Sequence, residues 1–114
     1  MIDFLFDALE DFFDFIGEIV STIINGVISF FQHIVGWFKG LNLKKGRDIP
    51  FVADAQSEKF KEMLKQAPKK DVGIFEGVYN EDTNEITHYK YLEGDEIDAK
   101  TQDLLGDEEL VVLE

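Results

Sequence analysis

The sequence predicts an α+β protein, in which one long N-terminal helix, amphipathic to apolar in character, precedes a small α-β-β-α-β domain with a three-stranded sheet. Polar residues recur with a helical period through the first forty residues, and short strand-like segments with turn residues follow Pro50. Charge divides the chain at the same places, because residues 1–40 sum to −5, residues 41–50 to +2 and residues 51–114 to −10, giving −13 in total. We therefore expect a long assembly or membrane helix over 1–40, a basic breaker or linker over 41–50 and a small acidic domain over 51–114.

The spacing of polar side chains predicts the long helix. From Asp3 onward the steps between them are four, four and three residues, repeated, which is an 11-residue period of about 3.67 residues per turn. These side chains form a polar stripe on a single helix of nearly forty residues, and the stripe comprises Asp3, Asp7, Asp11, Asp14, Glu18, Ser21, Thr22, Asn25, Ser29 and His33.

The remaining circumference of this helix is apolar and wider than the stripe of about 100° that a globular surface helix needs. We expect lipid, or copies of the same helix, to cover it. The alternative is a central helix buried in a monomeric α+β domain. The predicted assembly or lipid-contact face comprises Phe13, Ile16, Val20, Ile23, Ile24, Val27, Phe30, Phe31, Ile34 and Trp37.

Residues 19–38 contain no formal charge, and twenty residues are about the length that spans a hydrocarbon core. A basic flank follows them, formed by Lys39, Lys44, Lys45 and Arg47. Three geometries stay open: the helix spans the bilayer with its N-terminus outside, lies flat in the interface, or packs against copies of itself without lipid. Three interpretations of the basic flank also stay open: a membrane-orienting segment, an anionic-lipid patch or a solvated linker.

The second domain contains two helical segments and three strands. A hairpin turn is expected at NEDTN, and Gly106 is the predicted C-cap of the second helix. In chain order the expected elements are a helix at Ser57–Gln66, strands at Val72–Tyr79 and Ile86–Leu92, a helix at Asp95–Leu105 and a closing strand at Leu110–Leu113.

Few residues suggest reaction chemistry. Asn80, Asp82 and Asn84 imitate the start of a calcium loop, but Glu85 and Tyr91 stand where that loop needs Gly and a bidentate Glu. The chain has no cysteine, no Gly-rich phosphate loop and no metal-ligand spacing, so we expect no enzyme activity, cofactor, metal or small-molecule substrate. His33 and His88 are read as packed or hydrogen-bonded imidazoles. A charge of −13 argues against nucleic acid as a partner.

The sequence thus favours a non-enzymatic, self-assembling structural protein. Its long helices would pack side by side into a homo-oligomer or filament that is membrane-associated, with the acidic C-terminal domain exposed. Its partners would be other copies of itself and lipid. The alternative is a small membrane-active protein, pore-forming or holin-like, with the polar stripe lining a water path. The acidic N-terminus predicts no cleavable signal peptide, so location would be a membrane or a supramolecular assembly.

Overall fold

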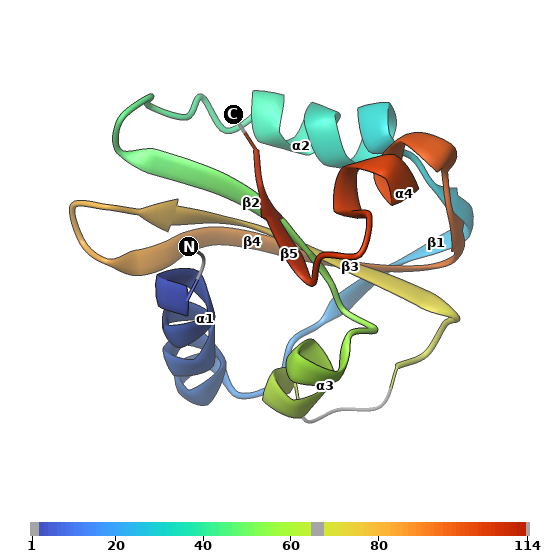
Figure 1. Cartoon of the computed structure of the whole chain (residues 1–114), viewed down its shortest axis with the longest axis horizontal. Coiled ribbons are helices and arrows are strands. Elements are labelled where there is room, and N and C mark those ends of the chain that lie inside the picture. Colours follow the sequence, from blue (N-terminus) through green and yellow to red (C-terminus); the bar gives the residue numbers. More distant parts are fainter. Residues whose placement is uncertain (1–2, 65–67, 114) are drawn as a thin grey trace.

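A five-stranded mixed sheet with the strand order β1-β4-β3-β2-β5 lies between two layers of helices (Figure 1). The computed structural model describes residues 3–64 and 68–113. β1 runs parallel to β4, and the other neighbouring strands are antiparallel. In chain order the elements are α1 (Asp3–Ile16), β1 (Ser21–Ile28), η1 (Phe30–Val35), α2 (Gly36–Lys39), β2 (Asp48–Asp54), α3 (Glu58–Leu64), β3 (Val72–Asn80), β4 (Glu85–Ile97), α4 (Ala99–Leu105) and β5 (Leu110–Val112).

The predicted fold is wrong in its first part, because no helix runs through residues 1–40. α1 has 14 residues, and the chain turns at Gly17, whose φ of 80° lies in the left-handed region that favours glycine. The next segment is rich in Ile, Val and Thr, whose branched side chains fit a strand better than a helix. It forms β1, and only after Ser29 does the chain become helical again, with the π-helical η1 leading into the short α2.

The side chains of β1 do not alternate between polar and apolar as those of a regular strand do, partly because of a bulge. The pairing of β1 with β4 is irregular between Ile24 and Val27, and Gly26 there has a φ of 123°. An extra residue in one strand interrupts the alternation of side chains between the two faces of a sheet. The bulge affects only the residues from Asn25 onward. Ser21–Ile24 pair in regular register, yet two polar residues are followed there by two apolar ones, and this local sequence imitates the spacing of a helix.

The sheet was also predicted too small, with three strands in place of five. β1 comes from the predicted helix, and β2 begins inside the stretch that the sequence suggested as a linker. The hairpin of β3 and β4 lies where the turn residues placed it. β4 continues to Ile97, so α4 begins at Ala99 rather than at the predicted Asp95. α3 covers most of the predicted Ser57–Gln66 helix, whose end at Gln66 lies outside the described residues.

One face of the sheet is covered by α1 and α3, below the sheet in Figure 1. α1 buries Leu5, Phe6, Leu9 and Phe13, which recur on one side of the helix. The ring of Phe13 makes edge contacts with Phe75 on β3, 5.3 Å between centroids, and with a phenylalanine of α3. Residues 3–16 thus form part of the core together with β3 and α3.

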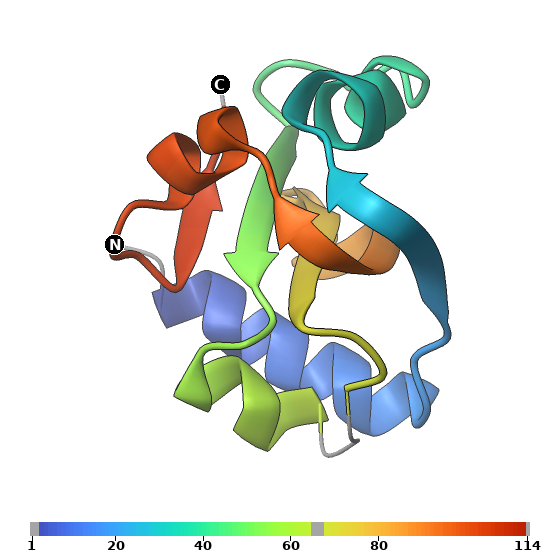
Figure 2. The ribbon, with the colours of Figure 1, turned by 90° about the vertical axis from the view of Figure 1, so that its right-hand side faces the viewer.

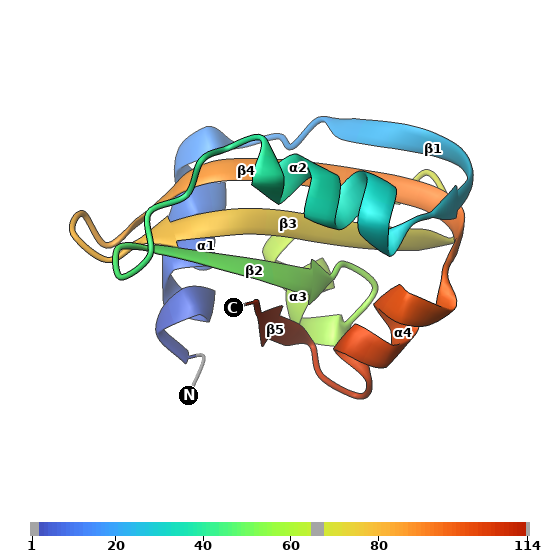
Figure 3. The same ribbon diagram turned by 90° about the horizontal axis from the view of Figure 1, so that it is seen from above.

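The opposite face is covered by η1, α2 and α4, as the view from above shows (Figure 3). A second cluster is centred here on Ile28, Ile34, Val52, Ile74, Leu92 and Leu105, all buried. Asp98 holds the layer together, because its carboxylate accepts hydrogen bonds from the Phe30 N–H at 3.0 Å and from the Thr101 N–H and hydroxyl at 3.0 and 2.6 Å. One side chain thereby caps the first turns of both η1 and α4.

Candidate functional site

A cleft of about 880 Å³ opens between α2, the following loop and the strands β2 and β5. Its walls are mainly apolar and include Phe30, Phe38, Leu43, Ile49, Pro50 and Val112. Pockets of this size with apolar walls and a few polar groups are typical of ligand sites in proteins. The cleft is therefore a candidate site for a largely apolar ligand.

Two lysines, Lys39 and Lys45, line the cleft, and both are exposed to solvent. Neither makes an ion pair or a side-chain hydrogen bond within residues 3–64 and 68–113. Residues 39–47 contain four of the 11 basic residues of the chain and no acid. The most basic segment of an otherwise acidic protein thus lies at this cleft.

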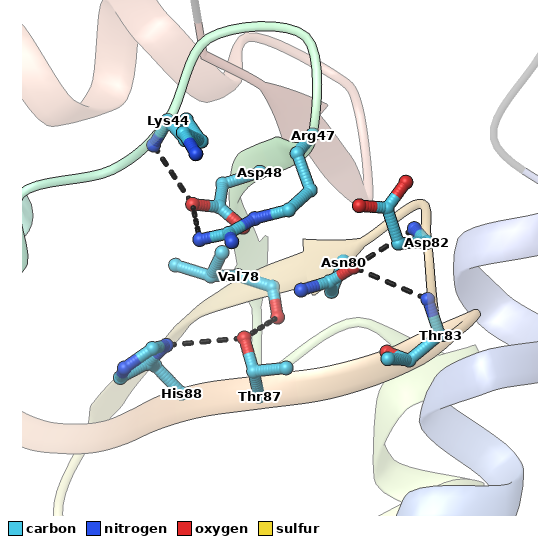
Figure 4. A network of polar contacts seen from close by, with 9 residues as sticks. All are labelled: Lys44, Arg47, Asp48, Val78, Asn80, Asp82, Thr83, Thr87 and His88. Carbon is cyan, nitrogen blue, oxygen red and sulfur yellow. Dashed lines mark hydrogen bonds and ion pairs between the residues drawn. The ribbon is translucent and has the colours of Figure 1, made fainter.

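The one acid of the cleft wall, Asp48, is paired with Arg47 and accepts three hydrogen bonds (Figure 4). Its oxygens accept hydrogen bonds from the Lys44 N–H at 2.8 Å and from two guanidinium nitrogens of Arg47 at 3.0 and 2.9 Å. The bond from Arg47, followed by that from the Lys44 backbone, holds the pKa of Asp48 below its usual range. The carboxylate is ionised at neutral pH and its charge is paired, so the two lysines are left to set the local potential.

The hairpin turn beside this loop is built by hydrogen bonds, and it contains the calcium-like residues (Figure 4). The side-chain oxygen of Asn80 accepts from the N–H of Asp82 at 2.8 Å and of Thr83 at 3.2 Å. The amide oxygen of Asn84 accepts from the hydroxyl of Tyr79 at 2.9 Å. These oxygens therefore serve the turn, and among the described residues no group of three or more acidic or imidazole side chains could hold a metal ion.

The two histidines have different surroundings. His33 accepts a hydrogen bond at Nδ1 from the Ser29 N–H at 2.8 Å and so stabilises the start of η1. His88 is exposed on β4, where its Nδ1 lies 3.1 Å from the hydroxyl of Thr87. The structure brings neither ring into the cleft.

The residues of the predicted assembly face are divided between the core and the surface. Phe13 and Ile34 are buried, and Ile16, Ile24 and Phe30 pack against the two clusters. Trp37 is half-buried against Phe38, with 4.9 Å between ring centroids. Four members of the predicted face are exposed: Val20, Ile23, Val27 and Phe31.

The polar stripe is likewise divided, because its members lie on three separate elements. Those of α1 are exposed acids on the outer side of the helix, at positions 3, 7, 11 and 14. Glu18 is exposed in the turn after α1, and Ser21, Thr22 and Asn25 lie on β1. Ser29 caps η1 by accepting a hydrogen bond from the Gln32 N–H, and His33 lies within η1. Of the basic flank, Lys39 and Lys45 line the cleft, whereas the Lys44 N–H and the Arg47 guanidinium donate to Asp48.

β1 is an edge strand of the sheet, and its outer side faces away from every other described element (Figures 2 and 3). It has eight residues without a charge or a proline. Apolar side chains in and directly before β1 are exposed: Val20 is 78% exposed, Ile23 40% and Val27 45%. Phe15 before the strand is 89% exposed and Phe31 after it is 62% exposed.

One buried acid was not found from the sequence. Glu76 on β3 is fully buried, and neither carboxylate oxygen has a hydrogen-bond partner in the described structure. Burial raises its pKa to about 9, although the charge of Lys90 opposes this shift. Glu93 is buried too, but it accepts hydrogen bonds from the N–H groups of Lys69 and Lys70. The sequence feature that could have indicated its burial is that Glu76 is the one charged residue in the otherwise apolar strand VGIFEGVYN.

The longest helix, α1, has 14 residues, and no helix among the described residues has both the length and the apolar character needed to cross a bilayer. No protein-family model matches the chain, and no curated protein or solved structure matches it either.

Proposed function

We propose that this chain is a non-enzymatic, self-associating protein whose copies pair through their β1 edges. The observation that carries this proposal is the character of β1, a long edge strand that is uncharged and flanked by exposed apolar side chains. Copies would meet through this strand and not through a long helix, since α1 ends at Ile16.

Edge strands of monomeric proteins are usually protected against pairing by charges, prolines, strong bulges or a short length. The opposite edge of this sheet follows that rule, because β5 has three residues and comes directly after two glutamates. β1 has a bulge at Gly26 but no charge within a chain of net charge −13. Unlike the rest of the acidic surface, it does not repel a second copy.

A two-fold axis next to β1 would place the strand antiparallel to its own copy, which is the arrangement of an isologous dimer. The five-stranded sheet of one copy would then continue into that of the other. Backbone groups on the outer side of β1 would pair across the axis, and Ile23 and Val27 would bury their exposed surface. Val20 comes directly before the strand and is 78% exposed, so it would extend this contact.

The test is the oligomeric state at several protein concentrations, measured by sedimentation velocity. We expect a dimer of the 13.1 kDa chain, or larger species, that dissociates on dilution. Ile23→Lys and Val27→Lys should each shift the population to monomer, because equal charges would face one another across the axis. The matched control is Val112→Lys, the same kind of change at a residue 37% exposed on the other edge strand.

A wild-type protein that stays monomeric at every concentration would overturn the proposal. So would a control variant that dissociates as readily as the β1 variants. Circular dichroism of all three variants separates lost association from lost folding, since both β1 side chains are already at least 40% exposed.

A further inference from the structure

We propose that the cleft between α2, β2 and β5 binds a single-chain amphiphile with an anionic head group, such as a free long-chain carboxylate. The acyl chain would occupy the apolar interior, and the carboxylate would lie at Lys39 and Lys45. This site is independent of self-association, because the cleft borders β5 and β1 is the opposite edge of the sheet.

The lining favours an acyl chain. Eight of the twelve residues around the cleft are apolar and belong to η1, α2, β2, β5 and the segments next to them. Removing apolar surface from water is favourable in proportion to the area buried, and each buried methylene contributes about 0.8 kcal/mol. Phe38 and Leu43 come from α2 and the following loop, and Pro50 and Val112 come from the sheet, so an inserted chain would contact apolar atoms of both layers.

The charge of the cleft specifies the head group. A protein of net charge −13 repels anions over most of its surface, but residues 39–47 contain four bases and no acid. Lys39 and Lys45 make no ion pair within the described residues, and the carboxylate of Asp48 is paired with the guanidinium of Arg47. An anionic head group is therefore attracted here, whereas a cationic amphiphile would meet uncompensated positive charge.

The same lining argues against a peptide as the occupant. A peptide backbone brings N–H and C=O groups that need partners when they leave water. The charged side chains of the cleft are two lysines, which donate only, and Asp48, whose oxygens already accept three hydrogen bonds. An acyl chain makes no such demand. A bilayer does not fit either, since a concave cleft encloses one chain rather than the flat surface of a membrane.

The chain contains a natural reporter of binding. Trp37 is the only tryptophan, and its ring lies 4.9 Å from that of Phe38 in the cleft wall. The experiment is a titration of the intact protein with octanoate, decanoate and dodecanoate below their micelle concentrations. Binding is followed by the fluorescence of Trp37 and, independently, by isothermal calorimetry. Dodecanol serves as the neutral analogue, and vesicles of anionic phospholipid represent a membrane surface.

We expect one carboxylate per chain, and affinity that rises by up to about four-fold for each added methylene until the cleft is full. Dodecanol should bind more weakly than dodecanoate, and added salt should reduce this difference. Lys39→Ala and Lys45→Ala should each weaken dodecanoate binding by about two- to five-fold, the range for an exposed ion pair. The matched control is Lys61→Ala, an exposed lysine of α3 on the opposite face of the sheet, which should leave affinity unchanged.

Several results would overturn the proposal. Affinity that does not depend on chain length would exclude the apolar interior as the binding site, and this arm uses the wild-type protein alone. Equal loss of binding in the Lys61→Ala control would point to a general charge effect. Binding to vesicles without binding to the free carboxylates would assign the basic segment to a membrane surface instead.

Discussion

Replacing the buried Glu76 by glutamine should remove one part of the pH dependence of folding stability. Both carboxylate oxygens are buried and lack a hydrogen-bond partner in the described structure, so nothing offsets the cost of removing a charged carboxylate from water. Burial raises its pKa from the ordinary 4.5 to about 9, with Lys90 acting in the other direction. In the native protein the acid is therefore neutral at pH 7, whereas in the unfolded chain it is ionised.

The sign of the effect follows from proton binding. Between the two pKa values the native state holds a proton that the unfolded state has released, so unfolding becomes easier as pH rises. The full stability is present below a pH of about 4.5 and is lost progressively up to about 9. One unit of pKa difference corresponds to about 1.4 kcal/mol, so the loss reaches about 3 kcal/mol at neutral pH.

Glutamine has the same shape and does not titrate in this range, so Glu76→Gln isolates this contribution. The free energy of unfolding, from urea titrations at several pH values, should rise in the variant relative to wild type by roughly 2 to 3 kcal/mol between pH 5 and pH 7. The buried amide also lacks partners, so the variant need not be more stable in acid. The slope of the difference against pH is the diagnostic quantity.

A second variant accounts for the general effect of net charge. Glu62→Gln removes one negative charge from the exposed surface of α3 and leaves the core unchanged. The reasoning would be refuted if the free energy of unfolding changed with pH in the same way in wild type, Glu76→Gln and Glu62→Gln. They would mean that the carboxylate finds water or a partner in solution and is not isolated in the core.

Three further substitutions test the fold. Asp98→Ala should lower the free energy of unfolding, measured by chemical denaturation, by about 1 to 3 kcal/mol, because the starts of η1 and α4 lose their cap. This loss should become smaller in acid. Burial raises the pKa of Asp98, but its hydrogen bonds together outweigh burial and hold the pKa low. Gly77→Ala should cost about 1 to 3 kcal/mol in the same assay, because the new methyl would lie 2.7 Å from the ring of buried Phe51; an unchanged midpoint would contradict this packing. Gly17→Ala, at a φ of 80°, should lower thermal stability by about 1 kcal/mol or more, whereas a gain with increased helical circular dichroism would favour the continuous helix.

Local patterns in the sequence determined several parts of this protein. The spacing of apolar residues in Asp3–Ile16 predicts a helix with one apolar face, because a helix is formed by contacts between near neighbours in the chain, but it predicts neither the end at Ile16 nor the burial of that face in the core. Turn residues at 80–84 and the apolar runs beside them locate the hairpin of β3 and β4 for the same reason. The basic character of residues 39–47 is visible in the sequence as well.

Only the tertiary structure decided what the remaining residues do. Ser21–Ile28 is a strand because it pairs with the edge of β4, more than sixty residues later in the chain. The spacing of side chains within a short segment does not reveal such a distant partner. The start of β2 was missed because Gly46 and Pro50 indicate a breaker, although this strand is held between β3 and β5. The burial of Glu76 and the gathering of Lys39 and Lys45 at an apolar cleft depend on elements distant in the chain. Local propensities are weak, of order 1 kcal/mol per residue, so non-local packing overrides them where the two disagree.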